Sequence, residues 1–116
     1  AVAGRGLKPM VMELGGSDPF IVLEDADLDL AVATGVQSRC LNSGQSCIAA
    51  KRFLVHRSRF DAFAERFAGA MQARVMGDPF EPEVHIGPLA REDLRDRLAD
   101  QVKRSVAAGA EALCGA

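Results

Sequence analysis

The chain has 116 residues, which is enough for one small domain with its own hydrophobic core. Hydrophobic residues make up 48% and charged residues 26%, a composition typical of a folded globular protein and not of a disordered chain. The net charge is −2, without a basic stripe, which argues against nucleic acid or an anionic membrane as the main partner. No apolar run approaches the roughly 20 residues that a membrane span needs.

The start of the chain and its cysteines bear on where the protein works. The first residues lack the charged and apolar regions of a signal peptide, and there is no initiator Met, so we expect a piece of a longer, cytoplasmic protein. Cys40, Cys47 and Cys114 cannot all pair, and none belongs to a CxxC motif. With only two histidines, far apart in the sequence, no metal site is expected. Cys40 and Cys114 are interpreted as small apolar side chains in a reducing compartment.

Two short strands and a helix are predicted in the first part of the chain. Apolar runs at 11–14 and 20–23 are bounded by turn residues, as strands are. A helix is predicted from Asp25, because carboxylates suit a helix N-terminus. Its apolar positions keep a helical spacing as far as Cys40, and a Gly-containing turn at 42–44 ends it.

A third strand is predicted at 52–56, followed by a second helix. Ser58 and Asp61 form a capping-box-like pair at the start of this helix. One face of the helix is apolar and is interpreted as core; it carries Phe60, Phe63, Ala64, Phe67, Ala70, Met71 and Val75.

A loop rich in Gly and Pro is predicted at 77–82, and a last helix at 91–108 with Gly109 as its C-terminal cap. The side chains of this helix that should face inward are Leu94, Leu98, Val102 and Val106. The alternation of strands and helices predicts a layered α/β fold, with a largely parallel sheet and flanking helices.

Cys47 follows the turn at 42–44 and is the first candidate for chemistry. A thiol just past a Gly-containing turn can lie where backbone N–H groups point at it, and a helix N-terminus there would favour the thiolate. The same N–H groups could hold an oxyanion once the sulfur adds to a carbonyl group. A cysteine beside a turn is usually inert, however, so this spacing alone leaves both interpretations open.

Glu13 is the second candidate. It lies in an apolar run that two glycines close, an unusual place for a carboxylate that only faces solvent. Burial there would make it a better general base. The alternative is an ordinary glutamate on an edge strand before a turn. The two glycines are not a dinucleotide fingerprint, because no GxGxxG accompanies them.

Taken together, these two segments resemble the aldehyde dehydrogenase superfamily. Residues 12–20, Met-Glu-Leu-Gly-Gly-Ser-Asp-Pro-Phe, look like its Glu-Leu-Gly-Gly signature, and residues 42–47, Asn-Ser-Gly-Gln-Ser-Cys, look like its Gly-Gln-x-Cys signature. Glu13 and Cys47 are 34 positions apart, the separation that the family shows. The resemblance covers essentially all of the chain, and further stretches follow in the expected order at 25–29, 77–79 and 86–89. Within the superfamily, the stretches most similar to bacterial succinate-semialdehyde dehydrogenases are 15–20, 48–56 and 87–91.

The resemblance implies a mechanism and a cofactor. Cys47 would attack the aldehyde as a thiolate, a hydride would pass to NAD or NADP, and Glu13 would activate the water that hydrolyses the thioester. The Cys47 N–H would contribute to the oxyanion hole. Leu14 and Gly15 would lie near the nicotinamide.

The resemblance also implies that the chain is incomplete. Residues 1–116 match part of the family's catalytic domain, whereas the dinucleotide-binding domain and the oligomerisation segment are not in this chain. We therefore expect a homo-oligomer for the full-length protein, and an isolated 116-residue chain that does not oxidise its small-molecule aldehyde substrate.

Two departures from the family bear on substrate and regulation. Some succinate-semialdehyde enzymes have an Arg six residues before the nucleophile, where it helps to hold the substrate carboxylate; here the residue is Leu41. Arg39 is nearby, but on a helix it would point away from the direction of Leu41, so one does not simply replace the other. The carboxylate is then held by groups outside the chain, or the substrate is another aldehyde. Ala49, two residues after Cys47, excludes a local redox disulfide.

Several alternatives stay open at this point. The sequence does not give the aldehyde, the choice between NAD and NADP, or the oligomeric state. A relative that releases its thioester to coenzyme A would depend less on Glu13. A catalytically silent family member is disfavoured because both Cys47 and Glu13 are present. An unrelated small α/β binding domain would require both signatures to be coincidence.

Overall fold

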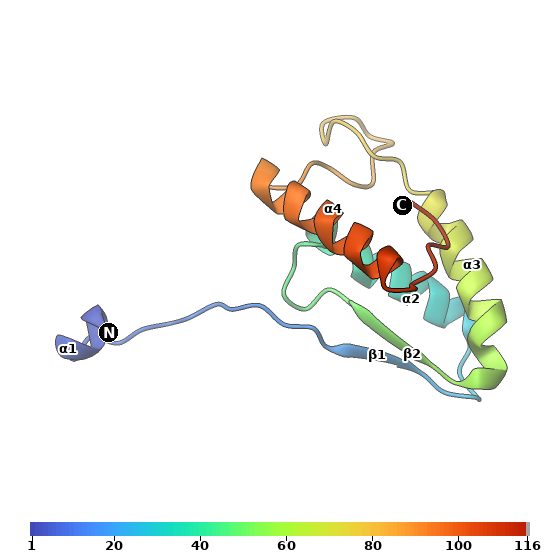
Figure 1. The fold of residues 1–116 in the computed structure, drawn as a ribbon, viewed down its shortest axis with the longest axis horizontal. Coiled ribbons are helices and arrows are strands. Elements are labelled where there is room, and N and C mark those ends of the chain that lie inside the picture. Colours follow the sequence, from blue (N-terminus) through green and yellow to red (C-terminus); the bar gives the residue numbers. More distant parts are fainter. Residues whose placement is uncertain (116) are drawn as a thin grey trace.

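The structure is a computed structural model that describes residues 1–115 (Figure 1). Its helices and strands in chain order are α1 (Val2–Arg5), β1 (Pro19–Val22), α2 (Leu28–Cys40), β2 (Arg52–Val55), α3 (Phe60–Gln72) and α4 (Glu92–Ala107). Two 3-10 segments, η1 (Leu41–Gly44) and η2 (Arg57–Arg59), follow α2 and β2. No helix in the described residues is both long and apolar enough to cross a bilayer.

β1 and β2 pair in parallel, with Phe20 opposite Phe53, and form the two-stranded sheet of the described chain. The connection between them runs through α2, as a parallel pair requires. α2 and α3 pack against one face of the sheet (Figure 1), whereas Ile21 and Leu54 on the other face stay exposed. The predicted α/β class, with a parallel sheet and flanking helices, is confirmed.

The core lies between the sheet and these two helices. Phe53 is at its centre, with its ring centroid 4.7 Å from that of Phe67 and 5.2 Å from that of Phe20. α2 can approach these rings because Gly35 has no side chain; a Cβ there would lie 3.1 Å from Phe53 Cε1. The buried residues of this cluster are Val22, Val32, Val36 and Phe63.

α2 is close to the predicted helix at both ends. The Asp27 carboxylate caps it by accepting hydrogen bonds from the N–H groups of Asp29 and Leu30, at 3.0 and 3.1 Å. The helix ends at Cys40, whose Sγ lies 3.9 Å from Met71 Sδ and packs against the core. The interpretation of Cys40 as a core residue is confirmed.

α3 differs from the prediction at both ends. Ser58 does not cap it with Asp61, because His56 Nδ1 accepts from the Ser58 N–H at 3.4 Å and lies 2.8 Å from Ser58 Oγ. The helix has no side-chain cap and begins after η2. Phe60 is more than half exposed, and Val75 lies beyond the end of the helix. The remaining Phe residues of this face belong to the core, as predicted.

α4 and its cap were predicted correctly, but its packing was not. Gly109 has φ +99°, and the Ala110 N–H donates to the Ser105 carbonyl, which closes the helix in a Schellman motif. No residue of α4 is buried, although four of its apolar side chains were predicted to face inward. Leu94 and Leu98 line an open hollow of about 670 Å³ instead of a packed interface.

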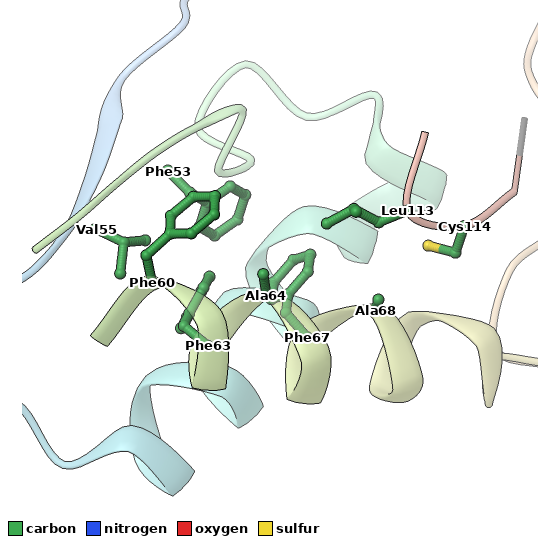
Figure 2. Close-up of a pocket in the computed structure, with 9 residues that line it drawn as sticks. All are labelled: Phe53, Val55, Phe60, Phe63, Ala64, Phe67, Ala68, Leu113 and Cys114. Atoms are coloured by element: carbon green, nitrogen blue, oxygen red, sulfur yellow. The ribbon is translucent and has the colours of Figure 1, made fainter. Parts of the chain in front are cut away.

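The segment after α4 is irregular over the described residues. Leu113 and Cys114 approach α3 and line an apolar hollow of about 190 Å³ with side chains of α3 and β2 (Figure 2). Cys114 is partly buried there, in agreement with its interpretation as a small apolar side chain.

The first part of the chain is an extended arm that leads from α1 to β1 (Figure 1). The strand predicted at 11–14 is wrong, because the segment pairs with no other backbone among the described residues. Its apolar side chains are exposed, including Val11 at 92%. An apolar run predicts extended backbone, but only a neighbouring strand makes it part of a sheet.

Candidate active site

Cys47 lies in the irregular segment between η1 and β2, in a turn that the Ala49 N–H closes by donating to the Ser46 carbonyl at 3.1 Å. The thiol-bearing residue is exposed, whereas Ala49 and Ala50 directly after it are buried. No helix begins at Cys47, so the idea that a helix N-terminus favours its thiolate is wrong for this structure. We refer to residues 44–50 as the Cys47 loop.

The end of α2 holds both ends of the Cys47 loop. Arg39 Nη2 donates to the Gly44 carbonyl at 2.5 Å, and Arg39 Nη1 donates to the Ala50 carbonyl at 2.7 Å. Ser38 Oγ accepts from the Ala50 N–H at 3.1 Å. Because two of its guanidinium nitrogens are engaged with the backbone, Arg39 does not replace the anchoring Arg that some succinate-semialdehyde enzymes have at the position of Leu41.

Lys51 holds the middle of the Cys47 loop. Its Nζ donates to the carbonyl groups of Ser46 and Cys47, at 3.1 and 3.0 Å. In a trans peptide the N–H points opposite to the C=O, and the described part of the chain has no cis peptide. The N–H groups of Cys47 and Ile48 therefore point away from Lys51. Within residues 1–115, no hydrogen bond uses either of these N–H groups.

The turn before the Cys47 loop has an unusual backbone. Asn42, Ser43 and Gly44 have φ values of 51°, 54° and 77°, all in the left-handed region. Gly44 is favoured for two reasons, since its φ is left-handed and a Cβ there would lie 3.2 Å from the Arg39 carbonyl oxygen and 2.8 Å from Arg39 Nη2. The next residue, Gln45, is held by its own side chain, whose Oε1 accepts a hydrogen bond from the Ala90 N–H at 2.8 Å. The sequence indicated a turn here, but not three successive left-handed residues.

The segment that carries Glu13 reaches the Cys47 loop through the pairing of the strands. Parallel strands place the residues before β1 beside those before β2, and a Cβ on Gly16 would lie 3.3 Å from the Cys47 carbonyl oxygen. Arg52 Nε donates to the Ser17 carbonyl at 2.8 Å and fastens the arm at this point. Glu13 precedes Gly16 by three residues, so an extended chain places Glu13 within roughly 10 Å of Gly16.

Glu13 itself is exposed, so the burial that the sequence hypothesis required is absent in this structure. The structure brings its segment to the Cys47 loop at Gly16, but no hydrogen bond joins the Glu13 and Cys47 side chains among the described residues. Leu14 is 71% exposed, and nothing lies within 4 Å of the position that a Gly15 Cβ would take. The arm thus offers an apolar, open strip beside the Cys47 loop.

Sequence reasoning missed Lys51 and assigned no structural role to Arg39. A weak signal for both was present: two basic residues flank a short, Gly-containing loop on either side of the candidate cysteine. Leu41, at the position where some succinate-semialdehyde enzymes have an Arg, is about half exposed and lines a hollow of about 270 Å³ with Asn42 and His85.

Comparisons with known proteins agree with the resemblance. A profile described as "Aldehyde dehydrogenase family" matches residues 1–116. The chain is 55% identical over 115 residues to a protein from Mycobacterium ulcerans (strain Agy99) named succinate-semialdehyde dehydrogenase 1, with NADP(+) in its name; the match covers 99% of this chain and 25% of that protein.

Two solved structures extend this agreement to the fold. A succinate-semialdehyde dehydrogenase from Burkholderia pseudomallei is 37% identical with a TM-score of 0.88, over 94% of this chain and 23% of that one. A cysteine-to-alanine variant of aldehyde dehydrogenase C from Pseudomonas syringae, complexed with NAD+ and octanal, is 34% identical with a TM-score of 0.90, over 97% and 23%. The chain spans about a quarter of the length of these relatives.

Proposed function

Because the chain belongs to the aldehyde dehydrogenase family, we propose that Cys47 is the nucleophile and Glu13 the general base of an enzyme that oxidises an aldehyde to a carboxylic acid with NAD or NADP. One observation supports this most directly. The segment before β1, which carries Glu13, lies against the Cys47 loop at Gly16, so both family signatures meet at one place.

The first step is the attack of the Cys47 thiolate on the aldehyde carbon. A C–S bond forms, and the carbonyl oxygen becomes an oxyanion. The free N–H groups of Cys47 and Ile48 can donate to this oxyanion, because Lys51 holds the carbonyl groups of the same peptides on the opposite side. The exposed position of Cys47 leaves room for the substrate.

The arm provides contacts for one part of the cofactor only, the nicotinamide. Leu14 and Gly15 offer an exposed apolar side chain and open space beside the Cys47 loop, which suits a flat ring. NAD or NADP, when bound, supplies the acceptor for the hydride that leaves the substrate carbon. The resulting thioester stays on Cys47. Groups for the remainder of the cofactor are expected in the dinucleotide-binding domain, outside this chain.

The last step is the hydrolysis of the thioester. Glu13 takes a proton from water, the oxygen of which adds to the thioester carbonyl; the C–S bond then breaks, and the acid and the Cys47 thiolate are released. Glu13 is on the exposed arm, so a water molecule can reach it. A carboxylate that acts through water does not need to touch the sulfur.

For the substrate, we propose succinate semialdehyde, since the name of the Mycobacterium ulcerans relative gives this aldehyde. Leu41 provides no cation for the carboxylate, and Arg39 is held by the Cys47 loop. The carboxylate would then be bound by residues outside this chain. We further propose that the chain is part of the catalytic domain of a longer, cytoplasmic enzyme that forms homo-oligomers.

The test is an assay of the full-length protein for NADH and NADPH formation, over semialdehydes and uncharged aldehydes, with Cys47→Ala beside it. We expect turnover that depends on Cys47 and is fastest with succinate semialdehyde. Equal activity of Cys47→Ala would contradict the mechanism. Fast turnover of uncharged aldehydes beside slow turnover of semialdehydes would contradict only the proposed substrate.

A further inference from the structure

Two basic side chains, Arg39 and Lys51, together bind four carbonyl groups of the Cys47 loop. Arg39 reaches the loop from α2 and takes the carbonyls at its two ends. Lys51 follows the loop directly and takes the two carbonyls on either side of the Cys47 nitrogen. Ser38 and Gln45 add one hydrogen bond each, and the Ala49 N–H to Ser46 carbonyl bond is the loop's only internal backbone hydrogen bond among the described residues.

We propose that Arg39 and Lys51 are positioning residues for the reaction at Cys47. Arg39 fixes the span of the Cys47 loop and so the place of the thiol. Lys51 fixes the tilt of the two peptides whose N–H groups face the oxyanion. This inference rests on the proposed function of Cys47, and it adds two residues that have no contact with the reacting atoms.

The backbone before the loop shows why such support is needed. Three successive left-handed residues lead into the loop, and each non-glycine residue in this region costs about 1–2 kcal/mol. Asn42 and Ser43 are the two non-glycine residues with left-handed φ in this turn. Hydrogen bonds from a cation to a carbonyl are stronger than those between neutral groups, so Arg39 can offset this cost. Without Arg39 the loop would relax, and Cys47 would move with it.

Arg39 acts on the place of the thiol and Lys51 on the oxyanion donors, so two different reactions can distinguish their roles. Alkylation by iodoacetamide forms no oxyanion, so at a pH where the Cys47 thiol is fully ionised in every variant its rate reports the place and exposure of Cys47. Aldehyde oxidation needs both the thiol and the oxyanion donors. Loss of Arg39 should therefore slow both reactions, whereas loss of Lys51 should slow aldehyde oxidation alone.

The experiment compares Arg39→Ala, Arg39→Lys and Lys51→Met in the full-length protein. We expect kcat to fall about 10- to 100-fold in Arg39→Ala and Lys51→Met, with KM little changed, because a displacement of about 1 Å has effects of this size. Arg39→Lys should recover part of the loss, since an ammonium keeps the charge but lacks the two separate nitrogens with which the guanidinium reaches the Gly44 and Ala50 carbonyls. Mass spectrometry of the Cys47 peptide after brief iodoacetamide treatment gives the second readout.

Arg59→Ala is the matched control. Arg59 Nε also donates to a backbone carbonyl, that of Glu24 at 2.6 Å, but at the opposite ends of the strands from Cys47. Its kcat and its alkylation rate should stay at the wild-type values. An equal loss of kcat in Arg59→Ala would overturn the inference, because it would show a general loss of stability.

Two further outcomes separate this inference from the proposed function. If Cys47→Ser is inactive while Arg39→Ala and Lys51→Met keep the wild-type kcat, the positioning roles are wrong and the mechanism stands. If Cys47→Ser is active, the mechanism is wrong and the positioning roles fall with it. Lys51→Met changes a partly exposed side chain, so it tests the inference even if Arg39→Ala does not fold.

Discussion

The two segments that carry the family signatures are held in very different ways. The Cys47 loop is fastened by Ser38, Arg39, Gln45 and Lys51, all from the same chain. Among residues 1–115, the arm with Glu13 is hydrogen-bonded to the rest of the chain only near its junction with β1, and Glu13 itself is exposed. The chain thus holds the loop of its proposed nucleophile with several side chains, whereas no hydrogen bond among the described residues fixes the side chain of its proposed base.

The largest expected effect is a complete loss of function in the isolated chain. The 116-residue polypeptide should form no NADH or NADPH from any aldehyde, because it holds at most the nicotinamide end of the cofactor. The full-length protein, assayed at the same molar concentration, is the positive control. Cofactor turnover by the short chain would show that the Glu13 arm and the Cys47 loop suffice for catalysis. The weaker attachment of the arm would then have no effect on activity.

The next effect compares the core with the arm. Phe63→Ala should destabilise the 116-residue chain by about 3–5 kcal/mol, because Phe63 is buried among other Phe rings. Val11→Ala should change the free energy of unfolding by less than about 0.5 kcal/mol, since Val11 is exposed on the arm. Urea unfolding measures both. Similar losses in the two variants would mean that the arm is packed in solution.

A smaller effect tests the backbone that precedes Cys47. Gly44→Ala should cost at least about 1–2 kcal/mol, because φ is +77° and the new Cβ would meet Arg39 Nη2. Gly69→Ala is the matched control, as this residue lies inside α3 with nothing within 4 Å of its Cβ position. It should stabilise the chain by about 0.5–1 kcal/mol. Stability changes of the same sign would contradict the left-handed turn.

The smallest effect concerns the junction between the arm and the sheet. Arg52→Ala removes the exposed hydrogen bond from Arg52 to the Ser17 carbonyl. Such a bond stabilises the folded state by about 0.5–1.5 kcal/mol. Amide hydrogen exchange should become faster at 16–18 and stay unchanged in α3. Faster exchange throughout the chain would show that this contact supports the whole fold and not the arm alone.

The sequence predicted the elements whose signals are local. The Asp27 cap, the helical spacing up to Cys40 and the Gly109 cap each depend on residues within a few positions, and all three are confirmed or close. The strand at 11–14 was wrong because pairing depends on a partner elsewhere in the chain. Ser58 was misjudged because His56 competes for its side chain and its N–H.

For the candidate site, the residue types could be predicted but their support could not. Cys47 and Glu13 were found from two motifs and their separation, and their roles stay predictions. Arg39 and Lys51 were not recognised as ligands of the Cys47 loop, since the direction of a long side chain depends on where the backbone carbonyls lie. Asn42, Ser43 and Gly44 are all turn residues, but many turn types accept them, so the sequence did not show that all three have left-handed φ.

The most direct test of the central claim is to trap the thioester on Cys47. The full-length Glu13→Gln protein, mixed with NADP and succinate semialdehyde, should accumulate an acyl adduct because its hydrolysis is slow. Peptide mass spectrometry should find the added succinyl mass on the peptide that contains Cys47, and not on those that contain Cys40 or Cys114. An adduct on another cysteine, or none while NADPH still forms, would contradict the account.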